Sequence, residues 1–188
     1  MSRQGGATLI EVLVAIIIVV VGLLGLAGLQ SRVSLAQVEA FQRSQAIVLV
    51  QDMASRIAVN RRIAEQYVTS TPQGTGNPAQ DCSTLTGKNL DMCEWNNELL
   101  GAAEAINGAS VGAMQGARGC VEELANTMPR KFLVSVVWQG TVPTVAPGAT
   151  TCGSGSYTDD KTRRAVTATV EIGCLQNDPA STLCISNF

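Results

Sequence analysis

Six cysteines are the residues of this 188-residue chain that could do covalent chemistry, and the chain has no histidine. An even number of cysteines in a segment expected outside the cytoplasm favours disulfide bonds. Because no CxxC pair and no histidine ligand is present, we expect no metal site. Sequence alone does not choose among the possible connectivities. We expect sequential nearest pairing, in which the last two cysteines pin the C-terminal tail. The disulfide candidates are Cys82, Cys93, Cys120, Cys152, Cys174 and Cys184.

Pairs of charged residues are the other candidates for chemistry. Asp159 and Asp160 lie in a loop rich in Gly, Ser and Thr. Two carboxylates there could bind calcium or act in catalysis, but a solvated turn is the simpler interpretation. Arg163 and Arg164 open a predicted strand and are interpreted as surface charge. Without histidine the Ser-His-Asp and Cys-His arrangements are excluded, and no serine or cysteine has an identifiable base partner.

The charge balance of the chain argues against nucleic-acid binding. Thirteen Lys and Arg stand against fifteen Asp and Glu, which gives a net charge of -2. A general nucleic-acid binder needs a basic surface that neutralises phosphates. We therefore expect a structural or binding protein rather than an enzyme, with no cofactor and no nucleic-acid partner.

The apolar residues concentrate in one run from Val12 to Leu29, and the uncharged stretch continues to Ser31. Such a stretch spans about 30 Å as a helix, which matches the hydrocarbon core of a bilayer. The alternative is a buried helix of a soluble domain, but the run is too long and too uniformly aliphatic for a domain of this size. Arg3 and the amino terminus favour the cytoplasmic side for the start of the chain, although Arg32 argues mildly for the reverse. We expect a single-pass anchor with the remainder of the chain outside the inner membrane.

Glu11 is the only charged residue between Arg3 and Arg32. A carboxylate in a membrane segment costs about 2.5–3.5 kcal/mol at mid-depth and less near the interface. It could be a boundary residue among the lipid head groups. We interpret it instead as a carboxylate that awaits a positive partner, such as the new amino terminus of another copy created by cleavage nearby.

The pattern of apolar residues predicts that the helix continues beyond the membrane. Residues 30–66 contain no proline, and their apolar positions recur at intervals of three or four residues. This predicts one helix from Thr8 to Gln66, with a first half in the membrane and a second, amphipathic half packed on a globular head.

A shorter helix is predicted from Asp91 to Ile106, with Asp91 as its N-cap and Glu94 as the capping-box partner. The segment before it, Thr69–Gln80, has the composition of a loop. The region Gly108–Gly119 is rich in small residues and is expected to be irregular.

Alternating apolar residues predict three strands in the rest of the chain. A long loop, Gly140–Lys161, separates the last two strands and is expected to be functional or poorly ordered. The predicted fold class is α+β, with a long N-terminal helix packed on a small antiparallel sheet in a disulfide-containing head. The predicted strands are Arg118–Leu124, Lys131–Gln139 and Arg163–Gly173.

Residues Gly6-Ala-Thr-Leu-Ile-Glu11, followed by the apolar run, resemble the class III signal of type IV prepilins and type II secretion pseudopilins. In that family a prepilin peptidase of the inner membrane cuts after the glycine and methylates the new amino terminus. The resemblance implies the pilin fold, cleavage between Gly6 and Ala7, N-methylation of Ala7 and a role for Glu11 in subunit assembly. Most members have Phe or another bulky apolar residue where this chain has Ala7. The implied domains are a leader at 1–6, a transmembrane or filament-core helix at 7–29, an amphipathic half-helix at 30–66 and a periplasmic head at 67–188.

The chain also resembles PilV-type minor pilins of the type IV pilus. This resemblance is carried by Gly22–Gln30, Gln51–Arg56, Asp91 with Trp95, and Val136–Gly140. It implies a minor subunit that primes pilus assembly, sits in a minor-pilin complex at or near the tip, and supports twitching motility and adhesion. The implied partners are other minor pilins, the major pilin, the prepilin peptidase, the inner membrane and a tip adhesin. The head would lie in the periplasm before assembly and on the pilus at the cell surface afterwards.

Three alternatives stay open at this point. A minor pseudopilin of type II secretion has the same signal and fold but serves a different machine. A single-pass anchored periplasmic enzyme or binding protein would keep Met1–Gly6 and show a substrate pocket. A DNA-binding pilin for uptake would need a more basic head.

Overall fold

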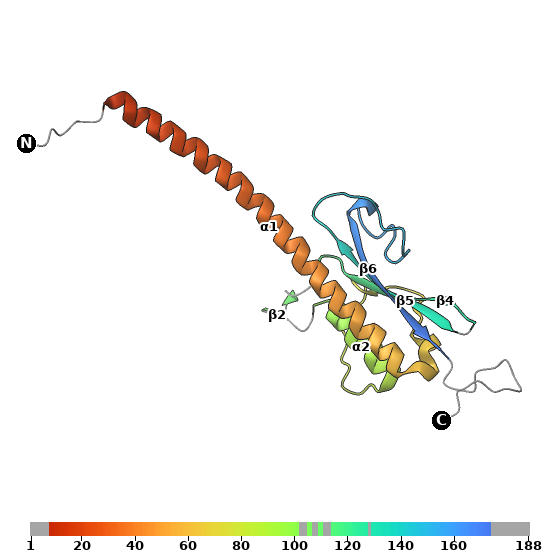
Figure 1. Ribbon diagram of the computed structural model, residues 1–188. Helices are drawn as coiled ribbons and strands as arrows, with labels where there is room; N and C mark the ends of the chain where they lie inside the picture. Colours follow the sequence, from red (N-terminus) through yellow and green to blue (C-terminus); the bar gives the residue numbers. More distant parts are fainter. Residues whose placement is uncertain (1–7, 102–104, 107–108, 111–113, 128, 174–188) are drawn as a thin grey trace, which may run out of the picture. The chain divides into compact units, whose positions relative to one another are not determined.

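The computed structural model (Figure 1) describes residues 8–101, 105–106, 109–110, 114–127 and 129–173. Its first element is helix α1 (Leu9–Val59). The chain divides after Ala40 into two compact units, and α1 runs through both. In the first unit the large apolar side chains of α1 are exposed, from Leu9 at 84% to Leu29 at 62%. By length and composition alone this helix could cross a membrane, and its apolar stretch is not buried by the rest of the described protein.

The long helix ends earlier than the sequence predicts. α1 stops at Val59 rather than at Gln66, and a 3-10 helix, η1 (Arg61–Tyr67), follows it. Asn60 lies at the junction, and its side-chain Nδ2 donates to Arg56 O at 3.1 Å. An asparagine side chain that bonds the preceding turn competes with the helical backbone pattern. The prediction of one unbroken helix through this junction is therefore wrong.

The second unit contains a four-stranded antiparallel sheet in the order β1-β4-β5-β6. The three predicted strands are confirmed to within one residue at each end. Strand β1 is a short addition within Thr69–Gln80, where the sequence predicts only a loop. A separate pair, β2 and β3, forms a second small sheet. The bounds are β1 (Gln73–Gly74), β2 (Ala105–Ile106), β3 (Ala109–Ser110), β4 (Arg118–Ala125), β5 (Arg130–Gln139) and β6 (Arg163–Ile172).

Helix α2 (Gly87–Leu99) differs from the predicted helix, which runs from Asp91 to Ile106. It begins earlier, so Asp91 lies inside the helix and is not its N-cap. It ends early because Gly101 adopts a left-handed conformation with φ of 69°. The Gly101 N–H donates to Glu98 O at 2.9 Å and closes the last turn.

Both faces of the four-stranded sheet are covered. On one face, alternate residues of β5 from Phe132 to Trp138 pack with residues of α1 and α2 in the main core. On the opposite face, Val137 of β5 packs with Tyr157 from the Gly140–Lys161 loop. The long loop therefore acts as a second cover of the sheet, and this explains why both alternating sets of β5 side chains are buried.

Helix α2 lies so close to β4 that no side chain fits at Gly119. A Cβ atom there would lie 2.4 Å from the ring of Trp95 and 2.7 Å from Leu99. The Trp95 ring is fully buried, and its Nε1 donates to Leu49 O of α1 at 3.1 Å. Because the ring cannot move without losing that hydrogen bond, Gly119 sets the distance between α2 and the sheet.

We expect Gly119→Ala to lower the free energy of unfolding by roughly 1–3 kcal/mol, the usual cost of overpacking a core. Gly148→Ala is the matched control, because a Cβ atom at Gly148 would meet no atom within 4 Å. Chemical unfolding of the full chain in detergent, followed by tryptophan fluorescence, measures both variants. Equal stability of the two variants would contradict the close contact between Gly119 and Trp95.

Candidate functional site

The first candidate site is the start of α1, where the sequence predicts cleavage and methylation. Gly6 and Ala7 lie outside the described residues. Glu11 lies in the first turn of α1, where its N–H donates to Thr8 O at 3.0 Å, and its side chain is exposed. A carboxylate in the first turn interacts favourably with the positive end of the helix dipole. Its exposure also leaves it accessible to a cation.

The second candidate site is an ion cluster around Arg56, which ties the second part of α1 to α2. Arg56 Nε lies 2.7 Å from Asp52 Oδ2. Arg56 Nη1 lies 3.0 Å from Asp91 Oδ1 and 2.6 Å from Glu94 Oε2. Glu98 is a fourth carboxylate, 3.8 Å from Nη2. A single guanidinium is therefore surrounded by one carboxylate of α1 and three of α2, and its shortest contacts are charge-assisted hydrogen bonds.

Asp91 extends the Arg56 cluster to η1. Its Oδ2 accepts hydrogen bonds from the Tyr67 hydroxyl and, at 3.2 Å, from Asn60 Nδ2. Tyr67 is fully buried. Burial, together with the hydrogen bond to Asp91, raises the pKa of the Tyr67 phenol above its ordinary value, so the hydroxyl remains a donor. Asp91 thus joins three helical elements rather than capping one of them.

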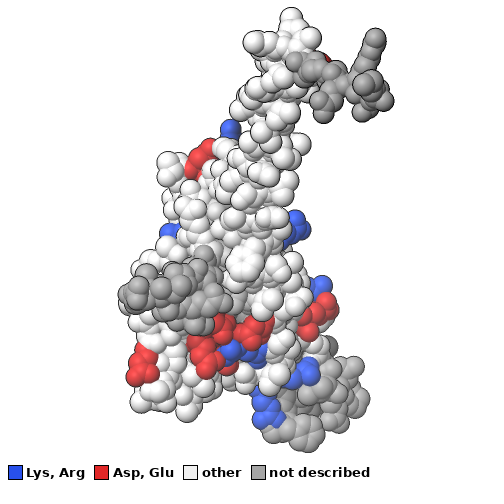
Figure 2. Space-filling model, turned by 90° about the vertical axis from the view of Figure 1, so that its left-hand side faces the viewer, with Lys and Arg blue, Asp and Glu red and all other residues white. Residues whose placement is uncertain are grey.

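The Arg56 cluster holds more negative than positive charge. Burial alone would lower the pKa of Arg56, but hydrogen bonds to three carboxylates raise it above its ordinary value, so the guanidinium stays charged. Burial, followed by repulsion from Asp52, raises the pKa of Glu98. Solvent relieves part of the excess, because the side chains of Glu94 and Glu98 are 41% and 35% exposed. Figure 2 shows acidic and basic side chains side by side on one face of the molecule.

The cysteines form the third candidate group. Cys82 is bonded to Cys93, and Cys120 is bonded to Cys152. Both are pairs that sequential pairing predicts. The first disulfide joins the segment before α2 to that helix, and the second joins β4 to the Gly140–Lys161 loop. Two further cysteines lie outside the described residues: Cys174 and Cys184.

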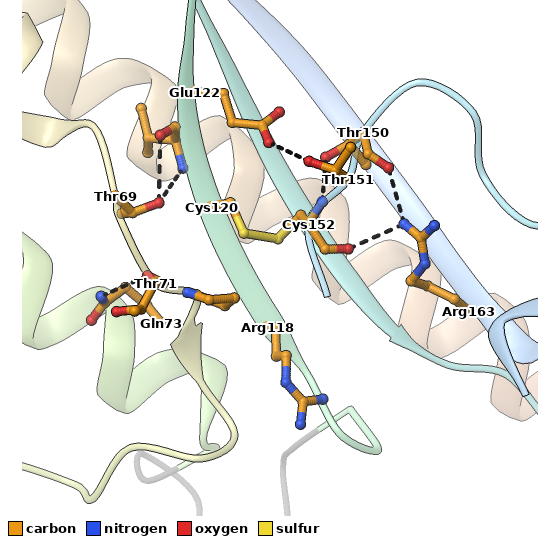
Figure 3. Close-up of a disulfide and its surroundings, with 12 residues drawn as sticks. Thr69, Thr71, Gln73, Arg118, Cys120, Glu122, Thr150, Thr151, Cys152 and Arg163 are labelled. Carbon is orange, nitrogen blue, oxygen red and sulfur yellow. Dashed lines mark hydrogen bonds between the residues drawn. A yellow bond between two sulfur atoms is a disulfide. The ribbon is translucent and has the colours of Figure 1, made fainter. Parts of the chain in front are cut away.

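Arg163 holds the long loop beside the second disulfide (Figure 3). The prediction of a surface charge is wrong, because its side chain is 4% exposed. Its guanidinium Nη1 donates to Thr150 O and to Cys152 O, each at 3.1 Å. Asp160, in the short helix η2 (Asp160–Thr162), lies 2.8 Å from Nε and is the counter-ion. The hydrogen bond from Arg163 lowers the pKa of the Asp160 carboxyl below its ordinary value.

The charged neighbours of Arg163 and Asp160 also hold the loop. Asp159 Oδ1 accepts a hydrogen bond from Lys161 N–H at 2.9 Å and so stabilises the turn into η2. The half-buried Arg164 donates to Val142 O and to Thr144 Oγ1, each at 2.7 Å. The two arginines at the start of β6 therefore bond both ends of the loop that precedes them.

A shallow pocket of about 310 Å³ lies beside the Cys120–Cys152 disulfide, between the Thr69–Pro72 segment and the long loop. Glu122 is its carboxylate, and Thr151 Oγ1 donates to Glu122 Oε1 at 3.0 Å. Serine and threonine hydroxyls make up most of the remaining polar lining, so the pocket has the chemistry of a polar binding surface. Over the described part of the chain, no group of three or more His, Cys, Asp or Glu residues could hold a metal ion.

The predictions from sequence missed the Arg56 cluster and the burial of Arg163. Part of the pattern that marks the Arg56 cluster is nevertheless present in the sequence. Asp52 and Arg56 are four residues apart on a predicted helix, a spacing that favours an ion pair. Asp91 and Glu94 are three apart, so they lie on one face of α2. That face is acidic, and its partner comes from a helix distant in the sequence. No comparable local pattern marks Arg163 as buried.

Comparison with known protein families gives two matches that follow one another along the chain. Residues 1–27 match the prokaryotic N-terminal methylation motif, and residues 28–96 match the family of the type IV pilin Tt1218. Residues 28–96 are therefore similar to a type IV pilin domain, and they follow a segment similar to the N-terminal methylation motif. Its long helix, antiparallel sheet and two disulfides are consistent with the type IV pilin fold, and the motif with the apolar helix fits a membrane-anchored pilin. Searches of curated proteins and of solved structures gave no match.

We expect Arg56→Met to lower the free energy of unfolding by roughly 2–3 kcal/mol, between the values typical of exposed and fully buried ion pairs. Methionine keeps an apolar stem but leaves Asp91 and Glu94 without their cation. Arg43→Met is the matched control, because Arg43 lies exposed on the same helix, and it should change stability by less than about 0.5 kcal/mol. Urea unfolding of the full chain in detergent gives both values. A loss no larger for Arg56→Met than for the control would refute the cluster's role.

Proposed function

We propose that the protein is a PilV-type minor pilin of the type IV pilus. The observation that carries the proposal is the uninterrupted order of methylation motif and pilin domain along residues 1–96. In this function a prepilin peptidase cuts between Gly6 and Ala7 and methylates Ala7. The subunit then joins other minor pilins at the inner membrane, primes assembly of the major pilin, and is carried at or near the tip. There it supports twitching motility and adhesion, with a tip adhesin as a further partner.

Glu11 is proposed to set the axial register of the subunit. Its carboxylate is surrounded along the chain by apolar side chains, so transfer into lipid or a filament core without a partner is unfavourable. The methylated amino terminus of an adjacent subunit supplies a positive charge. In a medium of low dielectric constant this attraction is stronger than in water. Arrangements that leave Glu11 unpaired are therefore disfavoured against the one that pairs it.

The second unit, Phe41–Phe188, supplies a body suited to a subunit interface. The Arg56 cluster fixes the second part of α1 against α2, and the Cys120–Cys152 disulfide fixes the long loop against β4. These links constrain segments that are far apart in the sequence. A head constrained in this way can present one defined surface to its neighbours in the periplasm and later on the pilus.

The mass of the N-terminal peptide from native membranes tests whether the protein is processed as a pilin. We expect N-methylated Ala7 as the first residue in the wild-type strain, and a chain that keeps Met1–Gly6 in a strain without the prepilin peptidase. Retention of Met1–Gly6 in both strains would mean a plain membrane anchor and would overturn the proposal.

Fractionation separates the pilus from the related secretion machine. A minor pilin is expected in sheared pili, and its deletion should reduce surface pili and twitching. A minor pseudopilin of type II secretion would have the same methylated Ala7 but would be absent from sheared pili. In that case deletion would impair protein secretion and leave the pili unchanged.

We expect Glu11→Ala to leave membrane insertion unchanged and to reduce the protein in sheared pili at least about tenfold, which corresponds to roughly 1.4 kcal/mol. The physical reason is the loss of the charge that pairs with the neighbouring amino terminus. Leu13→Ala is the matched control, because it shortens an exposed apolar side chain in the same helix without changing charge. Quantitative immunoblots of membranes and sheared pili measure both variants. Normal incorporation of Glu11→Ala would count against the assembly role.

A further inference from the structure

Strand β6 forms one edge of the four-stranded sheet. Its pairing with β5 runs without a shift over the whole of Arg163–Ile172. In the continuation of this register, Gly140 N–H donates to Thr162 O at 2.8 Å, so the even-numbered residues of β6 are those bonded to β5. The residues between them direct their N–H and C=O groups away from β5, as the antiparallel pattern requires.

The outward backbone groups of β6 are satisfied at its two ends. At the start, Arg163 N–H donates to Asp160 O. Just past the end, Arg61 Nη2 donates to Gly173 O at 2.6 Å. Between these positions the outward N–H and C=O groups have no hydrogen-bond partner among the residues that the structure describes. They belong to Ala165, Thr167, Thr169 and Glu171.

The opposite edge of the sheet is protected. Strand β1 pairs with the first two residues of β4, and Thr69 exchanges hydrogen bonds with Val121 of β4 at 2.9 and 3.0 Å. Beyond them, the register of β4 with β5 shifts between Glu123 and Ala125. Such irregularities are a common means of discouraging further pairing at an edge. Within Arg163–Ile172, strand β6 has neither a proline nor a register shift.

The two sides of β6 define the kind of strand that would fit beside it. On the core side, Val166, Ala168 and Val170 continue the apolar row of the main core out to the edge. On the other side, Thr169 and Glu171 are exposed. A strand added here would place apolar side chains beside the valines and polar ones at the alternate positions.

We propose that β6 is a docking edge for an extended segment of a neighbouring pilin subunit, which adds a strand of alternating apolar and polar residues to the sheet. This inference rests on the proposed function, because it needs a second subunit beside the head. An extended main chain is the chemistry that matches the edge, since it offers N–H and C=O groups at the spacing of the unpaired groups in β6.

Hydrogen exchange at single amides of β6 tests the docking edge on the full chain. One sample is the chain purified in detergent as separate subunits, and the other is labelled in native membranes. We expect the amides of residues 165, 167, 169 and 171 to exchange rapidly in detergent and at least about tenfold more slowly in membranes. The amides of residues 166, 168 and 170 are internal references, because β5 protects them in both samples.

Thr167→Pro removes one outward N–H while leaving the bonded pairs of the β5–β6 ladder intact, since proline is tolerated on the solvent side of an edge strand. We expect it to abolish the slow exchange at residues 165 and 169 in membranes. Thr167→Ala keeps the N–H and should behave as wild type. If exchange at residues 166 and 168 shows that Thr167→Pro disturbs the fold, Thr169→Pro tests the same point one outward position further along.

The outcomes separate this inference from the proposed function. Fast exchange of the outward amides in both samples overturns the docking edge, as does slow exchange in detergent, which would mean that the chain's own residues cover it. Slow exchange in membranes alone, lost in Thr167→Pro and kept in Thr167→Ala, supports it. Sheared pili are scored independently. If the outward amides of β6 are protected in membranes but the protein is absent from sheared pili, the docking edge stands and the pilus function is rejected. If the protein is present in sheared pili but these amides exchange rapidly in membranes, the pilus function stands and the docking edge is rejected.

Discussion

The Arg56 guanidinium is the group on which the arrangement of the helices in the second unit depends. It bonds carboxylates of both α1 and α2, and one of these, Asp91, also accepts the hydrogen bond of the buried Tyr67 in η1. Partly buried ion pairs contribute little net stability compared with well-packed apolar residues, but removing one partner is strongly unfavourable. Such a cluster therefore favours one arrangement of α1, α2 and η1 over other arrangements of these helices. The position of α2 in turn places Trp95 against Gly119, which connects the helices to the sheet.

A second cation performs a related task on the other face of the sheet. Arg163 is buried at the start of β6, where it binds two backbone carbonyls of the long loop and the Asp160 carboxylate. The Cys120–Cys152 disulfide fixes the same loop from β4. The loop is therefore a structural cover, although its length and composition suggest a functional or poorly ordered segment. With both faces covered and the β4 edge protected, β6 retains a regular edge whose outward backbone groups have no partner among the described residues.

The sequence correctly predicts the strands, which are marked by a pattern of neighbouring residues. It fails where residues with a familiar local pattern bond a part of the chain that is distant in the sequence. The alternation of apolar residues in the sequence around Phe132 and Val166 identifies β5 and β6, because such a pattern can be recognised without knowledge of the partner strand. Asp91 and Glu94 have the spacing of a capping box. In the folded protein their carboxylates bond Arg56 instead, so the predicted start of α2 is displaced. The burial of Arg163 depends on carbonyls of a loop whose path is set by a disulfide, and no periodicity encodes it.

Most of the four-stranded sheet lies beyond the part of the chain that matches known families. The two family matches cover residues 1–96, which include Glu11, Arg56 and Asp91. Of these residues, Arg56 and Asp91 fix the second part of α1 to α2, and Glu11 is the residue to which the proposed function assigns a role in assembly. Strands β4, β5 and β6 lie beyond residue 96, and with them lie the second disulfide and the outer edge of β6. Because an edge selects its partner through the side chains beside it, the features that would distinguish one neighbouring subunit from another belong to this later part of the chain.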